Sequence, residues 1–218
     1  MSIKQNLESI KASIPENVTL VAVSKTKPES DLMEAYNAGQ RIFGENKIQE
    51  MVDKHASLPK DISWHMIGHV QRNKVKYMAP FVSLIHGVDS FKLLKEINKE
   101  AEKESRVIDC LIQIKIAEED SKFGMAKTDA ITMLQSEAFK QLQNVKITGV
   151  MGMATFTDDE VQVTAEFNRL KSVFDELKTI NNHLEIISMG MSGDYELAIN
   201  CGSNMIRVGS SIFGERNY

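Results

Sequence analysis

The chain has 218 residues, a formal net charge of −4, 42% hydrophobic residues and 26% charged residues. The slight acidic excess argues against non-specific nucleic-acid binding, which needs a basic face, and this hydrophobicity argues against disorder. The two cysteines, Cys110 and Cys201, are too few for a disulfide framework and have no neighbours at zinc-site spacing, so we expect no metal centre.

The N-terminal segment MSIKQNLESIKASI predicts an amphipathic helix with polar residues throughout. This segment lacks the apolar core of a signal peptide. No later apolar run approaches the roughly 18 residues that a membrane span needs. We therefore expect a cytoplasmic protein that does not associate with membranes.

Short apolar runs alternate with helical patterns along the rest of the chain. The runs predict strands at residues 18–24, 41–43, 64–67, 82–86, 107–116, 146–151, 184–188 and 205–208. The patterns between them predict helices at residues 29–37, 46–56, 90–103, 129–143, 158–180 and 194–200. Apart from the second and third runs, these are continuous β-branched and apolar segments, typical of strands buried on both faces of a parallel sheet.

This rhythm gives about 27 residues per strand–helix unit, which fits an α/β fold, the compact (β/α)8 TIM barrel. An open, doubly wound sheet is the alternative that periodicity leaves open. No Pro-rich or Gly/Ser-rich linker marks a domain boundary, so we expect a single domain spanning residues 1–218. In a barrel, functional residues gather at the carboxyl ends of the strands.

Lys25 follows the most apolar run of the chain. Strand alternation puts Val21, Val23 and Lys25 on one side. If that side faces the barrel axis, desolvation favours the neutral amine that Schiff-base chemistry needs. A solvated lysine at a strand end, like Lys27, is the alternative interpretation.

The last two predicted strand ends are rich in hydroxyl groups and glycines. They carry Ser188, Gly190, Ser192, Gly209, Ser210 and Ser211. In barrels the loops after strands 7 and 8 often hold a phosphate, and hydroxyls with exposed backbone amides suit one. Arg207 has the same strand parity as Gly209, so it can point inward beside this site. Ordinary turn chemistry, and an ion pair for Arg207, are the alternatives.

A lysine amine facing a phosphate site predicts one ligand that has both an aldehyde and a phosphate. Pyridoxal 5′-phosphate fits this description, and a sugar-phosphate aldolase uses the same pair of features. Among the other polar residues, Asn46 binds a ligand hydroxyl or caps a helix, and His69 lines the barrel mouth or lies in a surface loop. We expect His86 to be packed within the sheet.

Six segments occur in a characteristic order and cover nearly the whole chain: VAVSKTKP, FGENKIQE, WHMIGHVQRNK, SKFGM, GVMGMATFTDD and SMGMSGDYELAINCGSNMIRVGSSIFGERNY. Together they resemble the pyridoxal phosphate homeostasis protein family. The resemblance implies a barrel like the N-terminal domain of alanine racemase, with pyridoxal phosphate held as an internal aldimine on Lys25. It also implies the other cofactor-binding residues: Asn46 near the ring, Arg207 facing the pyridine nitrogen, and Ser188, Ser192, Gly209 and Ser210 at the phosphate.

An arginine cannot accept a proton, so Arg207 in that position keeps the ring nitrogen unprotonated and the ring a poorer electron sink. Racemases of this fold add a tyrosine base from a second domain and a partner subunit, and we expect no such domain in a chain ending at Tyr218. The resemblance therefore implies no catalytic residue and a homeostatic role, in which the protein buffers pyridoxal phosphate or delivers it to apo forms of the enzymes that use it. A weak amino-acid racemase and a phosphosugar enzyme without pyridoxal phosphate are the alternatives. A compact barrel without an obvious apolar patch leads us to expect a monomer.

Overall fold

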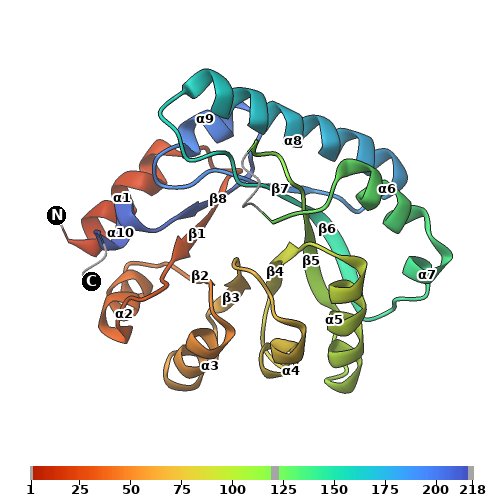
Figure 1. The fold of residues 1–218 in the computed structure, drawn as a ribbon. Coiled ribbons are helices and arrows are strands. Elements are labelled where there is room, and N and C mark those ends of the chain that lie inside the picture. Colours follow the sequence, from red (N-terminus) through yellow and green to blue (C-terminus); the bar gives the residue numbers. More distant parts are fainter. Residues whose placement is uncertain (1, 119–122, 216–218) are drawn as a thin grey trace.

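The computed structural model describes residues 2–118 and 123–215. Parallel strands close into a barrel in sequence order, with β1 paired to both β2 and β8 (Figure 1). The strands are β1 Thr19–Val23, β2 Ile42–Glu45, β3 Ser63–Met66, β4 Leu84–Val88, β5 Ile108–Gln113, β6 Val145–Met151, β7 Ile186–Ser188 and β8 Met205–Val208. The closed barrel confirms the predicted fold and excludes the open sheet.

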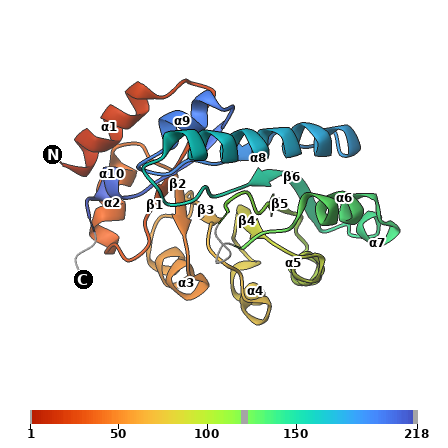
Figure 2. The ribbon, with the colours of Figure 1, turned by 45° about the horizontal axis from the view of Figure 1, so that its top comes forward.

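Helices surround the barrel and cover its outer face (Figures 1 and 2). They are α1 Ile3–Ser13, α2 Glu29–Asn37, α3 Ile48–Ser57, η1 Arg72–Lys74, α4 Val75–Met78, α5 Phe91–Lys103, α6 Lys127–Gln135, α7 Glu137–Lys140, α8 Glu160–Ile180, α9 Tyr195–Asn200 and α10 Ser210–Phe213. The first helix packs beside both α2 and the last helix, α10, so the two ends of the described chain meet on one side of the barrel (Figure 2). No helix among the described residues has the length and hydropathy to cross a membrane.

Several predicted boundaries were wrong for local reasons. The helix predicted over residues 129–143 is two helices, because Ser136 is extended and its side chain accepts the Phe139 N–H, which starts α7. The strand predicted over residues 107–116 ends at Gln113, after which Ile114 makes only an isolated bridge with Met125. The short helices η1, α4 and α10 were not predicted, since they are too short for a periodic pattern.

The inside of the barrel is layered from apolar to polar toward the carboxyl ends of the strands. A small apolar cluster fills the lower part: Val21, Leu84, Leu111, Met151 and Met205. Side chains two residues further along three of these strands share the same inward face, and they are His86, Gln113 and Arg207. All three are buried. A polar layer therefore lies between the apolar plug and the barrel mouth.

Candidate functional site

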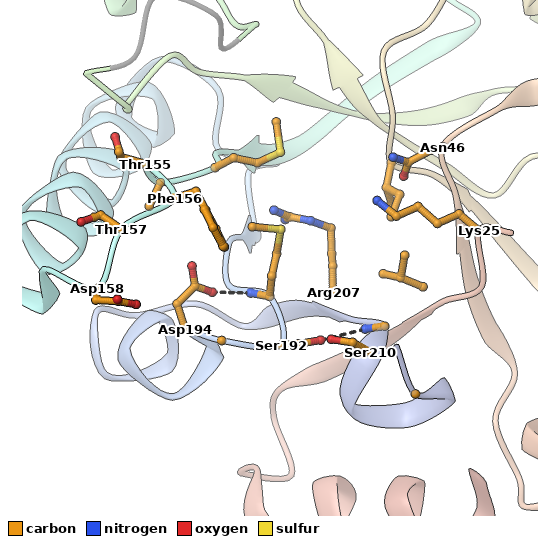
Figure 3. Close-up of a pocket in the computed structure, with 18 of the residues that line it drawn as sticks. Lys25, Asn46, Thr155, Phe156, Thr157, Asp158, Ser192, Asp194, Arg207 and Ser210 are labelled. Atoms are coloured by element: carbon orange, nitrogen blue, oxygen red, sulfur yellow. Dashed lines mark hydrogen bonds between the residues drawn. The ribbon is translucent and has the colours of Figure 1, made fainter. Parts of the chain in front are cut away.

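A cavity of about 590 Å³ opens at the carboxyl ends of the strands (Figure 3). Its walls come from the segment after β1, the loops after β2, β6 and β7, and the end of β8. The lining includes Lys25, Asn46, Ser192, Arg207, Gly209 and Ser210. These are all the residues predicted for the site except Ser188, so the structure brings together side chains from distant parts of the chain.

Lys25 lies in a tight turn directly after β1, and its side chain points into the cavity beside Asn46 (Figure 3). The next residue, Thr26, has φ +64°, a left-handed conformation that is strained for a β-branched residue. Its N–H donates to Glu50 Oε1 at 2.5 Å, which holds the strained residue in place. On the other side of Lys25, the Ser24 carbonyl accepts from Lys54 Nζ at 2.8 Å. The backbone of the lysine-bearing turn is thus fixed on both sides of Lys25.

The Glu45–Lys54–Glu50 cluster, which is ionic and largely buried, supplies these contacts. Lys54 Nζ donates to Glu45 Oε1 and to Glu50 Oε1, both at 2.8 Å. Ser24 Oγ also donates to Glu45 Oε1, at 2.6 Å. Burial raises the pKa of Glu45, while Lys54 and the Ser24 hydroxyl act in the opposite direction. This cluster could not be predicted from the sequence, because Lys54 belongs to α3 and reaches back to the turn after β1.

The opposite end of the cavity is built from backbone amides and hydroxyls. Ser192 Oγ accepts the Gly209 N–H at 3.1 Å, which ties the loop after β7 to the loop after β8 (Figure 3). Ser210 follows at the start of α10 and also lines the cavity. Lys27 also lines the cavity, and its Nζ donates to carbonyls at the C-terminal end of α10, those of Phe213, Gly214 and Glu215, at 2.9, 3.1 and 2.9 Å. The Gly209 amide and the Ser192 and Ser210 hydroxyls are donors of the kind that binds an anion such as a phosphate group.

Arg207 lies between these two ends (Figure 3). One terminal nitrogen, Nη1, donates to Ser188 Oγ at 2.6 Å, and the other, Nη2, donates to the Gly152 carbonyl at 3.1 Å. Burial lowers the pKa of Arg207 to about 10, against an opposing effect of the Asp194 carboxylate. The guanidinium therefore stays protonated at neutral pH and presents a fixed positive charge to the cavity.

Ser188 occupies a different place from the one predicted for it. It is fully buried and is not part of the cavity lining, because Arg207 covers it. Its hydroxyl lies 3.0 Å from His86 Nδ1, and His86 Nε2 lies 3.0 Å from His65 Nδ1. His86 is packed within the barrel, as predicted, but its contact with the site was not, since only its strand parity could have indicated an inward direction.

Both of these histidines are held neutral. Burial lowers the pKa of His65 to about 3. Burial also lowers the pKa of His86 well below its usual value, and the nearby His65 and Arg207 add to this effect. His69, in contrast, lies outside the cavity lining, 3.3 Å from Asp89 and stacked on Phe123. Among the described residues, no group of three or more His, Cys, Asp or Glu side chains could hold a metal ion.

Comparisons with known proteins agree with this architecture. The model of the family described as "Alanine racemase, N-terminal domain" matches residues 1–217. Pyridoxal phosphate homeostasis proteins from Vibrio alginolyticus and Escherichia coli K12 are 35% and 37% identical, over 100% and 94% of this chain and 99% and 88% of theirs.

Comparison with solved structures indicates the same fold. PipY of Synechococcus elongatus with PLP (pyridoxal phosphate) bound is 34% identical with a TM-score of 0.89, covering 98% of this chain and 100% of PipY. Alanine racemase from Clostridium difficile has a TM-score of 0.82 over 100% of this chain and 60% of its own. At 13% identity, that second likeness shows the shared fold alone.

Proposed function

Because the chain belongs to the pyridoxal phosphate homeostasis protein family, we propose that it binds pyridoxal 5′-phosphate through Lys25 and buffers or delivers this cofactor in the cytoplasm. The observation that carries the proposal is the cavity itself, which sets a lysine amine opposite an anion site of amides and hydroxyls, with an arginine between them. A ligand with an aldehyde, a basic ring nitrogen and a phosphate matches these three groups. PipY, a relative at 34% identity, was solved with PLP bound.

Each residue has a distinct part in this proposal. Lys25 Nζ would hold the aldehyde carbon of pyridoxal phosphate covalently, with loss of one water molecule. Ser192, Gly209 and Ser210 hold the phosphate group, and Asn46 lies beside the ring. In this bound form the reactive aldehyde is protected from other amines, and an incoming amine or water releases it.

Arg207 is one of two reasons why we propose storage and delivery rather than catalysis: it disfavours carbanion chemistry without abolishing it, since racemases of this fold manage it. The other reason is that, among the described residues, Lys25 is the one acid or base that we place beside the reacting carbon. The Arg207 guanidinium donates hydrogen bonds and accepts none, so it leaves the pyridine nitrogen unprotonated. An unprotonated ring withdraws electrons weakly, which disfavours carbanion formation on a bound amino acid. The barrel is therefore suited to holding the cofactor, and we propose that a monomer passes it to apo forms of the enzymes that use it.

The first experiment is an absorbance spectrum of the purified protein after incubation with pyridoxal phosphate, followed by borohydride reduction and peptide mapping. We expect a visible imine band and a reduced adduct on Lys25. Lys25→Ala should lose the adduct and retain weak binding through the phosphate end, while Lys47→Ala, which changes an exposed lysine on the neighbouring loop, should behave as the wild type.

Three results would contradict the proposal. An adduct on Lys27 would show that the wrong lysine was chosen. A protein that stays colourless and takes up no pyridoxal phosphate would remove the cofactor from the proposal altogether. Rapid racemisation of alanine by the loaded protein would favour the racemase alternative over storage.

A further inference from the structure

A continuous hydrogen-bonded chain runs from the cavity across the barrel axis. It begins at Arg207 on β8, passes through Ser188 on β7 and His86 on β4, and ends at His65 on β3. Its links measure 2.6, 3.0 and 3.0 Å. All four side chains are at most 5% exposed, so water does not compete for these bonds. Burying these polar side chains costs desolvation free energy, which indicates that they have a role besides packing.

The donor at the head of the chain favours one set of proton positions behind it. Arg207 can only donate, so Ser188 Oγ accepts its N–H. The Ser188 hydroxyl proton is then free to be donated to His86 Nδ1, which leaves the proton of the neutral imidazole on Nε2. His86 Nε2–H in turn donates to His65 Nδ1. This arrangement satisfies all three links with both imidazoles neutral, and among the described contacts of Ser188 it is the one that gives the hydroxyl proton an acceptor.

We propose that Ser188 and His86 are positioning residues, which hold the Arg207 guanidinium as the hydrogen-bond donor that faces the bound cofactor. The inference rests on the proposed function, since it concerns the orientation of Arg207 toward pyridoxal phosphate. A carboxylate in the place of Ser188 would also orient the guanidinium, but it would cancel its charge. The neutral chain fixes the direction of the N–H groups and leaves the whole positive charge for the cavity.

The first test needs no cofactor. In wild-type protein labelled with ¹⁵N-histidine, we expect His65 and His86 both to be neutral at neutral pH, with their protons on Nε2. A charged His86, or one with its proton on Nδ1, would overturn the inference, because the Ser188 hydroxyl could not then donate to it.

The second test uses pyridoxine 5′-phosphate, which lacks the aldehyde and therefore binds without Lys25 chemistry. With a ¹⁵N label in its ring, this ligand reports the hydrogen bond at the ring nitrogen. We expect Ser188→Ala to weaken its binding about tenfold and to shift the ring ¹⁵N resonance. Ser188→Thr, which keeps the hydroxyl, should restore both.

Ser203→Ala is the matched control. Ser203 is also a buried serine, and its hydroxyl contacts the carbonyls of Ile187, Met189 and Met205 rather than Arg207. We expect it to cost stability without changing the ring ¹⁵N resonance. Equal affinity and an unchanged resonance in Ser188→Ala, with a wild type that binds well, would overturn this inference and leave the proposed function standing. A wild type that binds neither pyridoxal phosphate nor pyridoxine 5′-phosphate would overturn both.

Discussion

Lys25 and Arg207 are supported by polar clusters of opposite character. Behind Lys25 the cluster is ionic, with Lys54 between the carboxylates of Glu45 and Glu50. Behind Arg207 the chain is neutral and consists of one hydroxyl and two uncharged imidazoles. Lys54 and Glu45 are buried, as are all members of the neutral chain, so the contrast between them does not come from a difference in solvent exposure.

The difference lies in what each cluster holds. The ionic cluster contacts the backbone on both sides of Lys25, at the Ser24 carbonyl and the Thr26 N–H, so it fixes the turn. The neutral chain contacts the guanidinium of Arg207 itself. Charged side chains can therefore hold a turn through its backbone, as they do at Lys25. Neutral partners are needed to hold Arg207, because its positive charge has to remain available to the cavity.

The largest effect is expected from removing the central charge of the ionic cluster. Lys54→Met leaves the Glu45 carboxylate buried without its cation, and breaking a buried ion pair costs about 3–5 kcal/mol of unfolding free energy. Glu45 Oε2 already has no hydrogen-bond partner, so little else can compensate. Urea unfolding measures this loss.

Lys140→Met is the control, because Lys140 pairs with Glu137 on the exposed surface and such pairs contribute little. Equal stabilities for the two variants would show that the Lys54 cluster does not hold the turn. A pyridoxal phosphate affinity that falls in Lys54→Met but not in Lys140→Met would tie the cluster to the position of Lys25.

The neutral chain predicts a distinct pH dependence of stability. The pKa of His65 in the folded protein is about 3, below the ordinary value of 6.5, so between these values the unfolded state binds more protons. Stability is therefore complete above about pH 6.5 and falls as the pH drops through this window, by about 1.4 kcal/mol per pH unit for each such histidine. The lowered pKa of His86 adds a contribution of the same sign.

This dependence can be measured by urea unfolding between about pH 7 and pH 5.5, where histidines titrate before most carboxylates. His65→Asn should reduce the slope of unfolding free energy against pH. His183→Asn, at an exposed histidine, should leave it unchanged. A wild-type slope that His65→Asn does not alter would show that His65 is not buried in its neutral form.

The same contrast explains which features of the fold and site could be predicted from the sequence. The barrel was predictable because apolar runs and helical patterns recur along the chain, and most candidate site residues were predictable because they follow strand ends. Lys54, His65 and His86 were not, since their partners are far away in sequence: Ser24 precedes Lys54 by 30 residues, and Ser188 follows His86 by 102. Ser188 was predicted at the phosphate from its place at a strand end and from the family resemblance. It lies buried against Arg207, because a place at a strand end does not give the depth of a side chain.

The smallest expected effect concerns the turn that carries Lys25. Thr26 and Ser105 are non-glycine residues with positive φ, +64° and +52°, but only Thr26 adjoins Lys25. A glycine at either position relieves left-handed strain and also gains freedom in the unfolded chain, so we expect both Thr26→Gly and Ser105→Gly to change stability by less than about 1 kcal/mol. Only Thr26→Gly also loosens the turn in the folded state, so it alone should weaken pyridoxal phosphate binding, by about two- to fivefold.

Pyridoxine 5′-phosphate distinguishes, in these variants, an effect on the Lys25 turn from an effect on Arg207 and the phosphate end. It cannot react with Lys25, so its affinity depends on Arg207 and the phosphate end, and it should be the same in Thr26→Gly as in the wild type. If Thr26→Gly weakens the binding of both ligands equally, the turn that carries Lys25 and the Arg207 side chain are coupled. The ionic cluster and the neutral chain would then not have separate roles. If it weakens neither, the contacts of Glu50 and Lys54 fix the turn without help from the restricted φ of Thr26.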